Sequence, residues 1–249
     1  MEAGGKGVLG ALACSNGTIV TGGFDIGLSS FVNSEVFVME ENAIAMACDY
    51  RPGLIVGGMS SGSVITCTEE QRCMPNVIGR HDLEVWAVHF DLGHSNLLHS
   101  GGDDSLWCGW DLRSEAPAFT CRHHSAGVCS IASHPTFEQL IITGSYDKQC
   151  ALWDRRNLRQ PLKTIIVDSG VWRLKWHPDN QRLVVLAACM YAGNYIFDFD
   201  VTDPQVIQKY DPNSLAYGCT WIDGEHVATC SFYNRELQIW QLDKQKDDP

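Results

Sequence analysis

The sequence predicts an all-β fold built from repeated units, and two observations support this prediction. His124 and Trp153 lie 43 positions after His81 and Trp110, with the intervening landmarks in the same order. Both copies also end in the dipeptide Trp-Asp. A period of about 40–45 residues that ends in Trp-Asp is typical of the WD-repeat β-propeller, in which each repeat is one four-stranded blade. Because one blade cannot bury both of its faces, we expect neighbouring blades to stack.

The repeat frame extends on both sides of these two copies and predicts six hairpins made by the second and third strands of successive blades. Gly58–Cys67 lies 43 positions before Gly101–Trp110. Ser15–Val20 reads as a turn and strand, with Glu35–Met39 as the next strand. Downstream, Ile196-Phe197-Asp198 replaces Leu-Trp-Asp, and the last copy ends soon after its third strand. We expect the first hairpin to lack its preceding inner strand and the last blade to lack its fourth strand.

These counts predict one propeller domain over residues 1–249. About six blades are represented in this chain and seven are expected in a full-length protein, so the N-terminal blade is missing or incomplete. A six-bladed ring with an open seam is the alternative. The Gly-rich residues 1–7 are expected to be disordered, and residues 243–249 form a polar tail.

Composition limits the classes of partner. A chain of 249 residues suits one all-β domain, and 18 Lys and Arg against 30 Asp and Glu give a net charge of −12. This balance disfavours nucleic-acid binding, which needs a basic footprint, and favours cationic partners. The apolar stretch Val8–Cys14 is too short for a membrane span and lacks the basic flank of a signal peptide. We therefore expect a cytoplasmic monomer that binds neither membrane nor nucleic acid.

The cysteines favour structural thiols. The chain has 11 cysteines, an odd number, with no Cys-x-x-Cys pair. Several lie in strand-like stretches, so buried free thiols in a reducing compartment explain them better than disulfides. We expect no metal site and no cofactor.

Most of the conspicuous polar residues have a structural interpretation. A His before the first strand, a Ser or Thr in the second, an Asp in the turn and a Trp in the third are expected to hydrogen-bond within each blade, because buried polar groups need partners. These sets are His81, Ser100, Asp104 and Trp110, and His124, Thr143, Asp147 and Trp153. The Gly-x-Ser-x-Gly match at Gly58–Gly62 falls on a turn of the repeat, so we interpret it as a hairpin rather than a nucleophile elbow.

The repeat does not account for a group of aromatic and acidic residues at one rim. The first residues of each inner strand, and the residue before each turn Asp, are expected to face the mouth of the central channel. The predicted binding residues are Glu84, Trp86, Tyr146, Trp172, Tyr217 and Phe232, with Asp103 beside them. Aromatic faces with carboxylates bind quaternary ammonium groups. The alternative is an ordinary protein-docking surface.

Several stretches are more specific than generic WD repeats. They are Ser100–Leu106, Thr143–Asp147, Gly170–Pro178, Leu186–Met190 and Ala228–Tyr233. In these stretches the chain resembles the diphthine methyl ester hydrolases, also called diphthine methyltransferases. The resemblance covers about residues 80–240. Residues 1–79 agree in repeat frame more than in residue identity, and the family's members are longer at the N-terminus.

The resemblance implies a step of diphthamide biosynthesis on one histidine of translation elongation factor two. The family removes the methyl of diphthine methyl ester as methanol and leaves a carboxylate, without a cofactor. This intermediate carries a trimethylammonium group, which agrees with the quaternary cation that the rim residues predict. A WD-repeat scaffold that mediates protein–protein interactions without catalysis is the alternative.

Hydrolysis of an ester needs an activated water or nucleophile and donors for the developing oxyanion. Asp103 or His123 is the candidate base, and Arg173 is the candidate oxyanion partner. Cys129 and Cys189 are possible nucleophiles. Each residue also has a structural interpretation. Asp103 is then a turn acid, His123 a loop residue and Arg173 a partner in an ion pair between blades. The two cysteines are then small apolar residues of the core.

Overall fold

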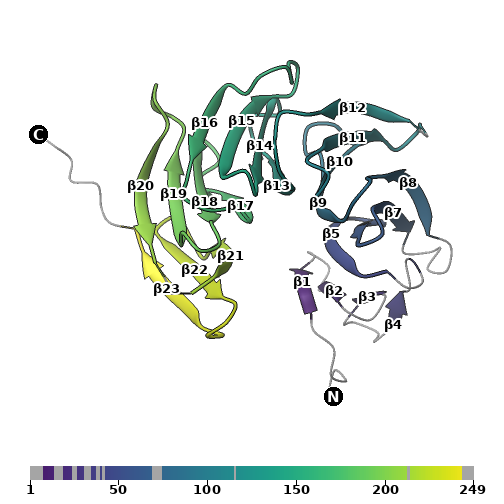
Figure 1. Cartoon of the computed structure of the whole chain (residues 1–249), viewed down its shortest axis with the longest axis horizontal. Coiled ribbons are helices and arrows are strands. Elements are labelled where there is room, and N and C mark those ends of the chain that lie inside the picture. Colours follow the sequence, from purple (N-terminus) through teal and green to yellow (C-terminus); the bar gives the residue numbers. More distant parts are fainter. Residues whose placement is uncertain are drawn as a thin grey trace, which may run out of the picture. The chain divides into compact units, whose positions relative to one another are not determined.

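The computed structural model describes most of the chain as β-strand. The described residues are 8–13, 19–23, 27–30, 35–37, 40, 43–68, 75–114, 116–211 and 214–242, of which those before 40 are described by backbone alone. They form strands β1 to β23 (Figure 1), and none of them belongs to a helix that could cross a membrane. The chain divides into two compact units, Met1–Ile131 and Ala132–Pro249. The prediction of one domain over 1–249 stays a prediction, and residues 1–7 and 243–249 lie outside the described residues.

Three antiparallel sheets of four strands lie in the first unit, each with its strands in chain order. The first contains β1 (Val8–Ala13), β2 (Ile19–Gly23), β3 (Gly27–Ser30) and β4 (Glu35–Phe37). The second contains β5 (Ala45–Arg51), β6 (Leu54–Met59), β7 (Ser63–Thr68) and β8 (Asn76–Arg80). The third contains β9 (Val85–Phe90), β10 (Leu97–Gly102), β11 (Trp107–Asp111) and β12 (Pro117–Cys121).

The remaining sheets repeat this order. The fourth contains β13 (Val128–Ser133), β14 (Leu140–Ser145), β15 (Gln149–Asp154) and β16 (Lys163–Ile166). The fifth contains β17 (Arg173–Trp176), β18 (Val184–Ala188), β19 (Asn194–Asp198) and β20 (Gln205–Tyr210). Among the described residues the last sheet has three strands: β21 (Ala216–Trp221), β22 (His226–Ser231) and β23 (Leu237–Gln241). The fifth and last sheets therefore carry the two downstream hairpins that the repeat frame predicts.

The start of the chain differs from expectation. Val8–Ala13 forms the inner strand that we expected the first hairpin to lack, and it pairs with Ile19–Gly23. Strand Gly27–Ser30 then lies between that strand and Glu35–Phe37, which is the fourth strand of the sheet rather than the third. The sequence signal was weak because Val8–Ala13 contains no polar side chain, so no alternation of large apolar and polar residues marks a strand.

The polar network predicted for the third sheet is confirmed. His81 Nδ1 lies 2.9 Å from Asp104 Oδ1, and His81 Nε2 lies 2.7 Å from Ser100 Oγ. The indole of Trp110 donates to the same Ser100 oxygen at 2.7 Å. A glycine is required beside this network, because a Cβ on Gly102 would lie 2.4 Å from His81 Nδ1. The network ties the inner edge of the sheet to its third strand.

The same indole-to-hydroxyl bond recurs in the second unit. Trp153 Nε1 donates to Thr143 Oγ1 at 2.8 Å, as predicted. Trp240 Nε1 donates to Thr229 Oγ1 at 3.2 Å in the last sheet. Because Thr143 and Thr229 are buried, each hydroxyl needs such a partner.

A second buried network of the third sheet was not predicted. His99 Nε2 lies 2.9 Å from Asp91 Oδ2, with both side chains fully buried. His99 Nδ1 accepts a hydrogen bond from Trp107 Nε1 at 3.2 Å. These residues lie outside the repeated landmarks of the sequence, so the period of 43 could not reveal them.

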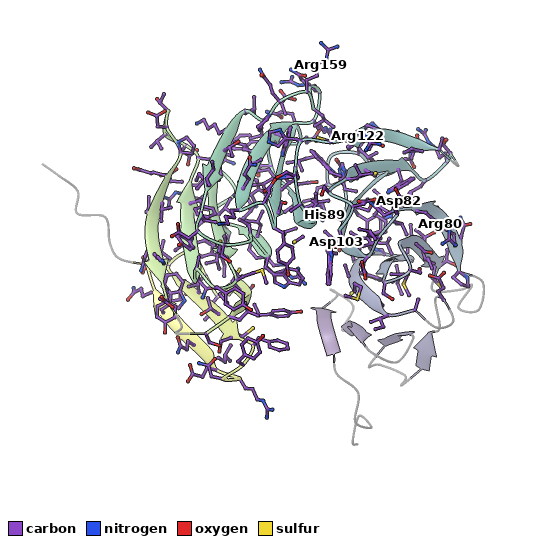
Figure 2. All side chains as sticks on the ribbon, viewed as in Figure 1. Arg80, Asp82, His89, Asp103, Arg122 and Arg159 are labelled. Atoms are coloured by element: carbon purple, nitrogen blue, oxygen red, sulfur yellow. The ribbon has the colours of Figure 1, made fainter. Side chains whose placement is uncertain are left out.

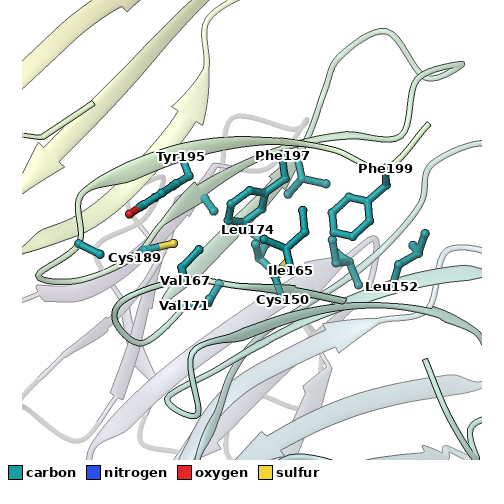
Figure 3. Packing of buried hydrophobic residues seen from close by; sticks show 14 of the residues in the cluster. Cys150, Leu152, Ile165, Val167, Val171, Leu174, Cys189, Tyr195, Phe197 and Phe199 are labelled. Carbon is teal, nitrogen blue, oxygen red and sulfur yellow. The ribbon is translucent and has the colours of Figure 1, made fainter. Parts of the chain in front are cut away.

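The core of the second unit is apolar. Side chains of the fourth sheet, including Leu152 and Ile165, pack against Tyr195, Phe197 and Phe199 of the fifth (Figure 3). Phe197 stands where the third and fourth sheets have the Trp of Trp-Asp, and it is fully buried. An apolar ring therefore replaces the hydrogen-bonding indole without leaving an unpaired donor in this core.

The turns predicted at His134-Pro135 and His177-Pro178 directly follow β13 and β17. His134 Nδ1 accepts from the backbone N–H groups of Thr136 and Phe137 at 3.1 and 3.0 Å. Its ring lies 4.7 Å from that of Trp176. Burial lowers the pKa of His134 below its usual 6.5, which favours the neutral ring that this geometry needs.

Replacing Ser100 by Ala is expected to lower the free energy of unfolding by about 1–3 kcal/mol, because the buried partners at His81 and Trp110 lose their shared hydroxyl. Urea denaturation measures the change. The exposed Ser95→Ala is the control, for which we expect a change within about 0.5 kcal/mol. Equal stabilities of the two variants would show that the network contributes nothing.

Stability is expected to fall as the pH drops below about 6.5, since the unfolded chain takes up a proton at His134 before the folded chain does. His134→Gln removes this contribution. The loss in Tm between about pH 7.5 and about pH 5.5 should therefore be smaller in His134→Gln than in the unchanged chain. His94→Gln, at an exposed position, should keep the full loss. The expectation fails if both variants lose the same amount.

Candidate functional site

The Gly-x-Ser-x-Gly segment is a hairpin, as interpreted from the sequence. Met59 ends β6, Ser63 begins β7, and Gly62 has a φ of 86°. The hydroxyl of Ser60 accepts a hydrogen bond from the backbone N–H of Ile44 at 2.8 Å. The segment joins two strands rather than a strand and a helix, so the nucleophile-elbow geometry is not formed.

Three of the predicted rim residues come together in the first unit. Trp86, in β9, donates its indole N–H at 3.2 Å to Oδ1 of Asp103, the residue labelled in Figure 2. The backbone N–H of Asp103 donates to the carbonyl of Glu84 at 2.8 Å. Gly127 permits this placement, because a Cβ there would lie 2.6 Å from Asp103 Oδ1. The carboxylate of Asp103 and the indole of Trp86 are thus hydrogen-bonded to each other at the turn end of the third sheet.

The other four predicted binding residues form a continuous line of rings in the second unit. The centroids of Tyr146 and Trp172 are 5.7 Å apart, with the rings at 72°. Those of Trp172 and Tyr217 are 5.5 Å apart, and those of Tyr217 and Phe232 are 5.2 Å apart. We call these four residues the aromatic row. Such tilted and edge-on contacts at 4.5–7 Å are the favoured geometry of aromatic pairs.

Each ring of the aromatic row comes from the turn end of a sheet. Tyr146 directly follows β14, Trp172 precedes β17, Tyr217 lies in β21 and Phe232 follows β22. Gly170 allows close approach, since a Cβ there would lie 3.1 Å from Tyr146 Cδ1. The row is therefore shared by the fourth, fifth and last sheets, and no single repeat could form it.

The residues of the aromatic row differ in how far they are buried: one supports the row from the core, and others are open to solvent. Trp172 is only 4% exposed, whereas Tyr146 is 39% and Phe232 is 52% exposed. The Arg173 guanidinium lies 4.7 Å from the Trp172 ring centroid and donates to the Trp172 carbonyl at 2.9 Å. Trp172 is thus the buried member of the row, and the Arg173 guanidinium stacks on its ring. Tyr146 and Phe232 expose ring faces that a ligand can reach.

Two further tyrosines extend the aromatic row. The Tyr233 ring lies 5.2 Å from Phe232 at 88°, and the neighbouring Tyr233 raises the pKa of the Tyr191 hydroxyl. The sequence analysis passed over both. The available signal was the position of Tyr233, which directly follows Phe232.

The fold matches known proteins. The family model described as WD domain, G-beta repeat matches residues 115–154. A chain in the structure titled "Crystal Structure of Mitotic Checkpoint Complex" superposes with a TM-score of 0.81, covering 97% of this chain and 76% of that chain at 19% identity. With the successive antiparallel sheets, these matches confirm the predicted all-β WD-repeat β-propeller.

Five curated relatives are named diphthine methyltransferase or its homologue. The chain is 46% identical over 148 residues to "Diphthine methyltransferase" of Mus musculus, covering 57% of this chain and 31% of that protein. It is 36% identical over 204 residues to "Diphthine methyltransferase" of Homo sapiens, covering 74% of this chain and 45% of that protein. Over 246 residues it is 32% identical to the Dictyostelium discoideum homologue, covering 87% of this chain and 64% of that protein. This chain is a homologue of the diphthine methyltransferases. It spans less than two thirds of the length of these three relatives.

The candidate base and oxyanion partner of this diphthine methyltransferase homologue lie in different surroundings. His123 is exposed, and its ring centroid lies 5.5 Å from that of His124. Asp103 is exposed but accepts the indole hydrogen bond of Trp86. Arg173 stacks on the aromatic row. The catalytic roles of His123, Asp103 and Arg173 stay predictions.

The candidate thiol nucleophiles are buried. Cys129 is 2% exposed, with its Sγ 3.3 Å from the Gly127 carbonyl. Cys189 is fully buried, and burial raises its thiol pKa well above the usual range. A thiolate is the nucleophilic form of Cys, so these surroundings disfavour attack by either sulfur. In the part of the chain that the structure describes, no three His, Cys, Asp or Glu side chains gather as metal ligands.

Trp172→Ala is expected to lower the free energy of unfolding by about 3–5 kcal/mol, because it empties a buried ring position. Phe232→Ala should cost less than about 1 kcal/mol, since half of that ring is already exposed. Thermal and urea unfolding of the two variants measure the difference. Similar losses would contradict the division of the aromatic row into support and open surface.

Proposed function

We propose that this chain acts in diphthamide biosynthesis by hydrolysing the methyl ester of diphthine methyl ester on translation elongation factor two. Water adds to the ester carbonyl carbon, the bond from that carbon to the methoxy oxygen breaks, and methanol and a carboxylate result. The support is homology to proteins named diphthine methyltransferase, at 31–46% identity in mammals, yeasts and Dictyostelium.

The observation that carries the proposal is the open part of the aromatic row. The proposed substrate bears a trimethylammonium group beside its ester. The exposed faces of Tyr146 and Phe232 are surfaces that attract such a cation through the ring quadrupole. The net charge of −12 also favours the approach of a cationic side chain.

The proposed chemistry needs two proton transfers, one from the attacking water and one to the departing methoxy oxygen. A general base takes a proton from the attacking water, and the departing methoxy oxygen receives one as methanol leaves. Arg173, stacked on Trp172, supplies positive charge at the row for the oxyanion. No step needs a cofactor, because hydrolysis requires only water.

A non-catalytic scaffold is the second candidate function, favoured by the exposure of the same rings. Tyr146 and Phe232, together with Tyr233 at 67% exposure, resemble the aromatic anchors of protein interfaces. Propellers host many functions, and protein docking fits this fold equally well. A docking surface and a catalytic site differ in whether the bound ester loses its methyl group.

Elongation factor two that carries the methyl ester is expected to lose the mass of one CH₂ group when incubated with this chain, as read by mass spectrometry. Phe232→Ala should raise KM about tenfold, the scale of a lost cation–π contact of about 1–2 kcal/mol. Ile166→Ala removes a side chain that is 74% exposed but outside the row, and should leave KM unchanged. Binding of the factor without any loss of mass would support the scaffold instead.

A further inference from the structure

The turn between β22 and β23 carries a carboxylate on the same turn as an open ring of the aromatic row. Phe232 directly follows β22, and Glu236 directly precedes β23. The backbone N–H of Ser231 donates to the Glu236 carbonyl at 3.0 Å, and the Glu236 N–H donates to Ser231 Oγ at 3.3 Å. These bonds join the two ends of the turn. Phe232 and Glu236 therefore leave one closed turn, and both are exposed.

Two amide groups hold the Glu236 carboxylate. Its Oε2 accepts a hydrogen bond from Asn234 Nδ2 at 3.0 Å and another from Gln238 Nε2 at 3.1 Å. The Gln238 amide is itself fixed, because its Oε1 accepts from the hydroxyl of Tyr210, whose ring stacks on Trp240 with centroids 5.4 Å apart. The carboxylate thus belongs to a chain of hydrogen bonds that extends from the last sheet to β20 of the fifth.

The charge of Glu236 is not neutralised within the described part of the chain. No lysine or arginine there forms an ion pair with it, in contrast to Asp154, which pairs with Arg156. The amides of Asn234 and Gln238 are neutral donors, so they hold the carboxylate in place without cancelling its charge. A cation that reaches the turn therefore meets a fixed negative charge.

A quaternary ammonium suits a carboxylate held in this way. Its nitrogen carries four carbon groups and no N–H, so it attracts a carboxylate by charge but donates no hydrogen bond to it. A carboxylate oxygen that loses water to such a cation would be left without a donor, which is costly. The two amides reduce this cost, because Oε2 of Glu236 keeps both of its hydrogen bonds when the cation displaces water.

The acids that the sequence analysis assigned to the cation belong to another unit. Glu84 and Asp103 flank strands of the third sheet in the first unit, whereas the aromatic row lies in the second unit. We propose that Glu236 is the carboxylate that binds the trimethylammonium group of the substrate, with that group on the Phe232 ring. This inference rests on the proposed function. A ring face and a held negative charge together select a permanent cation over a neutral group of the same shape.

Glu236→Gln tests the inference, because it removes the charge and keeps an oxygen to which Asn234 and Gln238 can donate. Choline and its neutral carbon isostere 3,3-dimethyl-1-butanol are the probes, and calorimetry measures their affinities. We expect the variant to bind choline about fivefold more weakly than the unchanged chain does, as loss of an exposed ion pair requires. The affinity for the neutral isostere should stay the same.

Glu225→Gln is the matched control. Glu225 also accepts a hydrogen bond from a glutamine amide, that of Gln241 at 3.2 Å, but it lies on the β21–β22 turn at the other end of the same sheet. The same loss of charge should there change the choline affinity by less than about 1.5-fold, because salt screens distant charges. Equal losses in the two variants would show that net charge, rather than the position of Glu236, attracts the cation, and would overturn the inference.

Turnover separates the inference from the function beneath it. With the methyl-esterified elongation factor, Glu236→Gln should raise KM for methanol release about fivefold and leave kcat within about twofold, since the cation is bound alike in substrate and transition state. An unchanged KM in a chain that releases methanol overturns the inference and leaves the proposed function in place. Absence of methanol release from the unchanged chain overturns the proposed function, whereas a loss of choline affinity confined to Glu236→Gln would still support the cation site.

Discussion

In three of its sheets the geometry of this protein depends on a hydrogen bond between the second and third strands. An indole on the third strand donates to a hydroxyl on the second at 2.7, 2.8 and 3.2 Å in Trp110–Ser100, Trp153–Thr143 and Trp240–Thr229. Because an unpaired buried donor or acceptor is costly, the bond fixes the register of the hairpin. Side chains at the same place in each repeat then emerge at the same end of their sheets.

The repeated strand order of the sheets explains how residues far apart in the sequence form the aromatic row in the second unit. Tyr146, Trp172, Tyr217 and Phe232 occupy turn-end positions of three successive sheets, and each ring contacts the next. These four residues differ in their exposure to solvent. Trp172 packs beneath the row with Arg173 stacked on it, whereas Tyr146 and Phe232 remain open to a ligand. A repeat that stabilises the fold thus also assembles the candidate site.

Features that recur with the period of 43 residues could be predicted from the sequence, whereas features outside that period could not. The hydrogen-bonding set at His81 and the membership of the aromatic row follow from repeat position. The network of His99 lies outside the landmarks, and the strand Val8–Ala13 lacks a strong apolar pattern. The burial of Trp172 depends on how turns of neighbouring sheets meet, which no single repeat encodes.

The central claim is that the open rings of the aromatic row select a quaternary cation. Titration of this chain with a trimethylammonium ligand and with its neutral tert-butyl isostere, followed by calorimetry, tests the claim most directly, because the two ligands share shape and differ in charge. The account predicts that the cation binds about tenfold more tightly, as a cation–π contact of about 1–2 kcal/mol requires. Equal affinities would contradict it, because shape and apolar contact alone would then explain the binding.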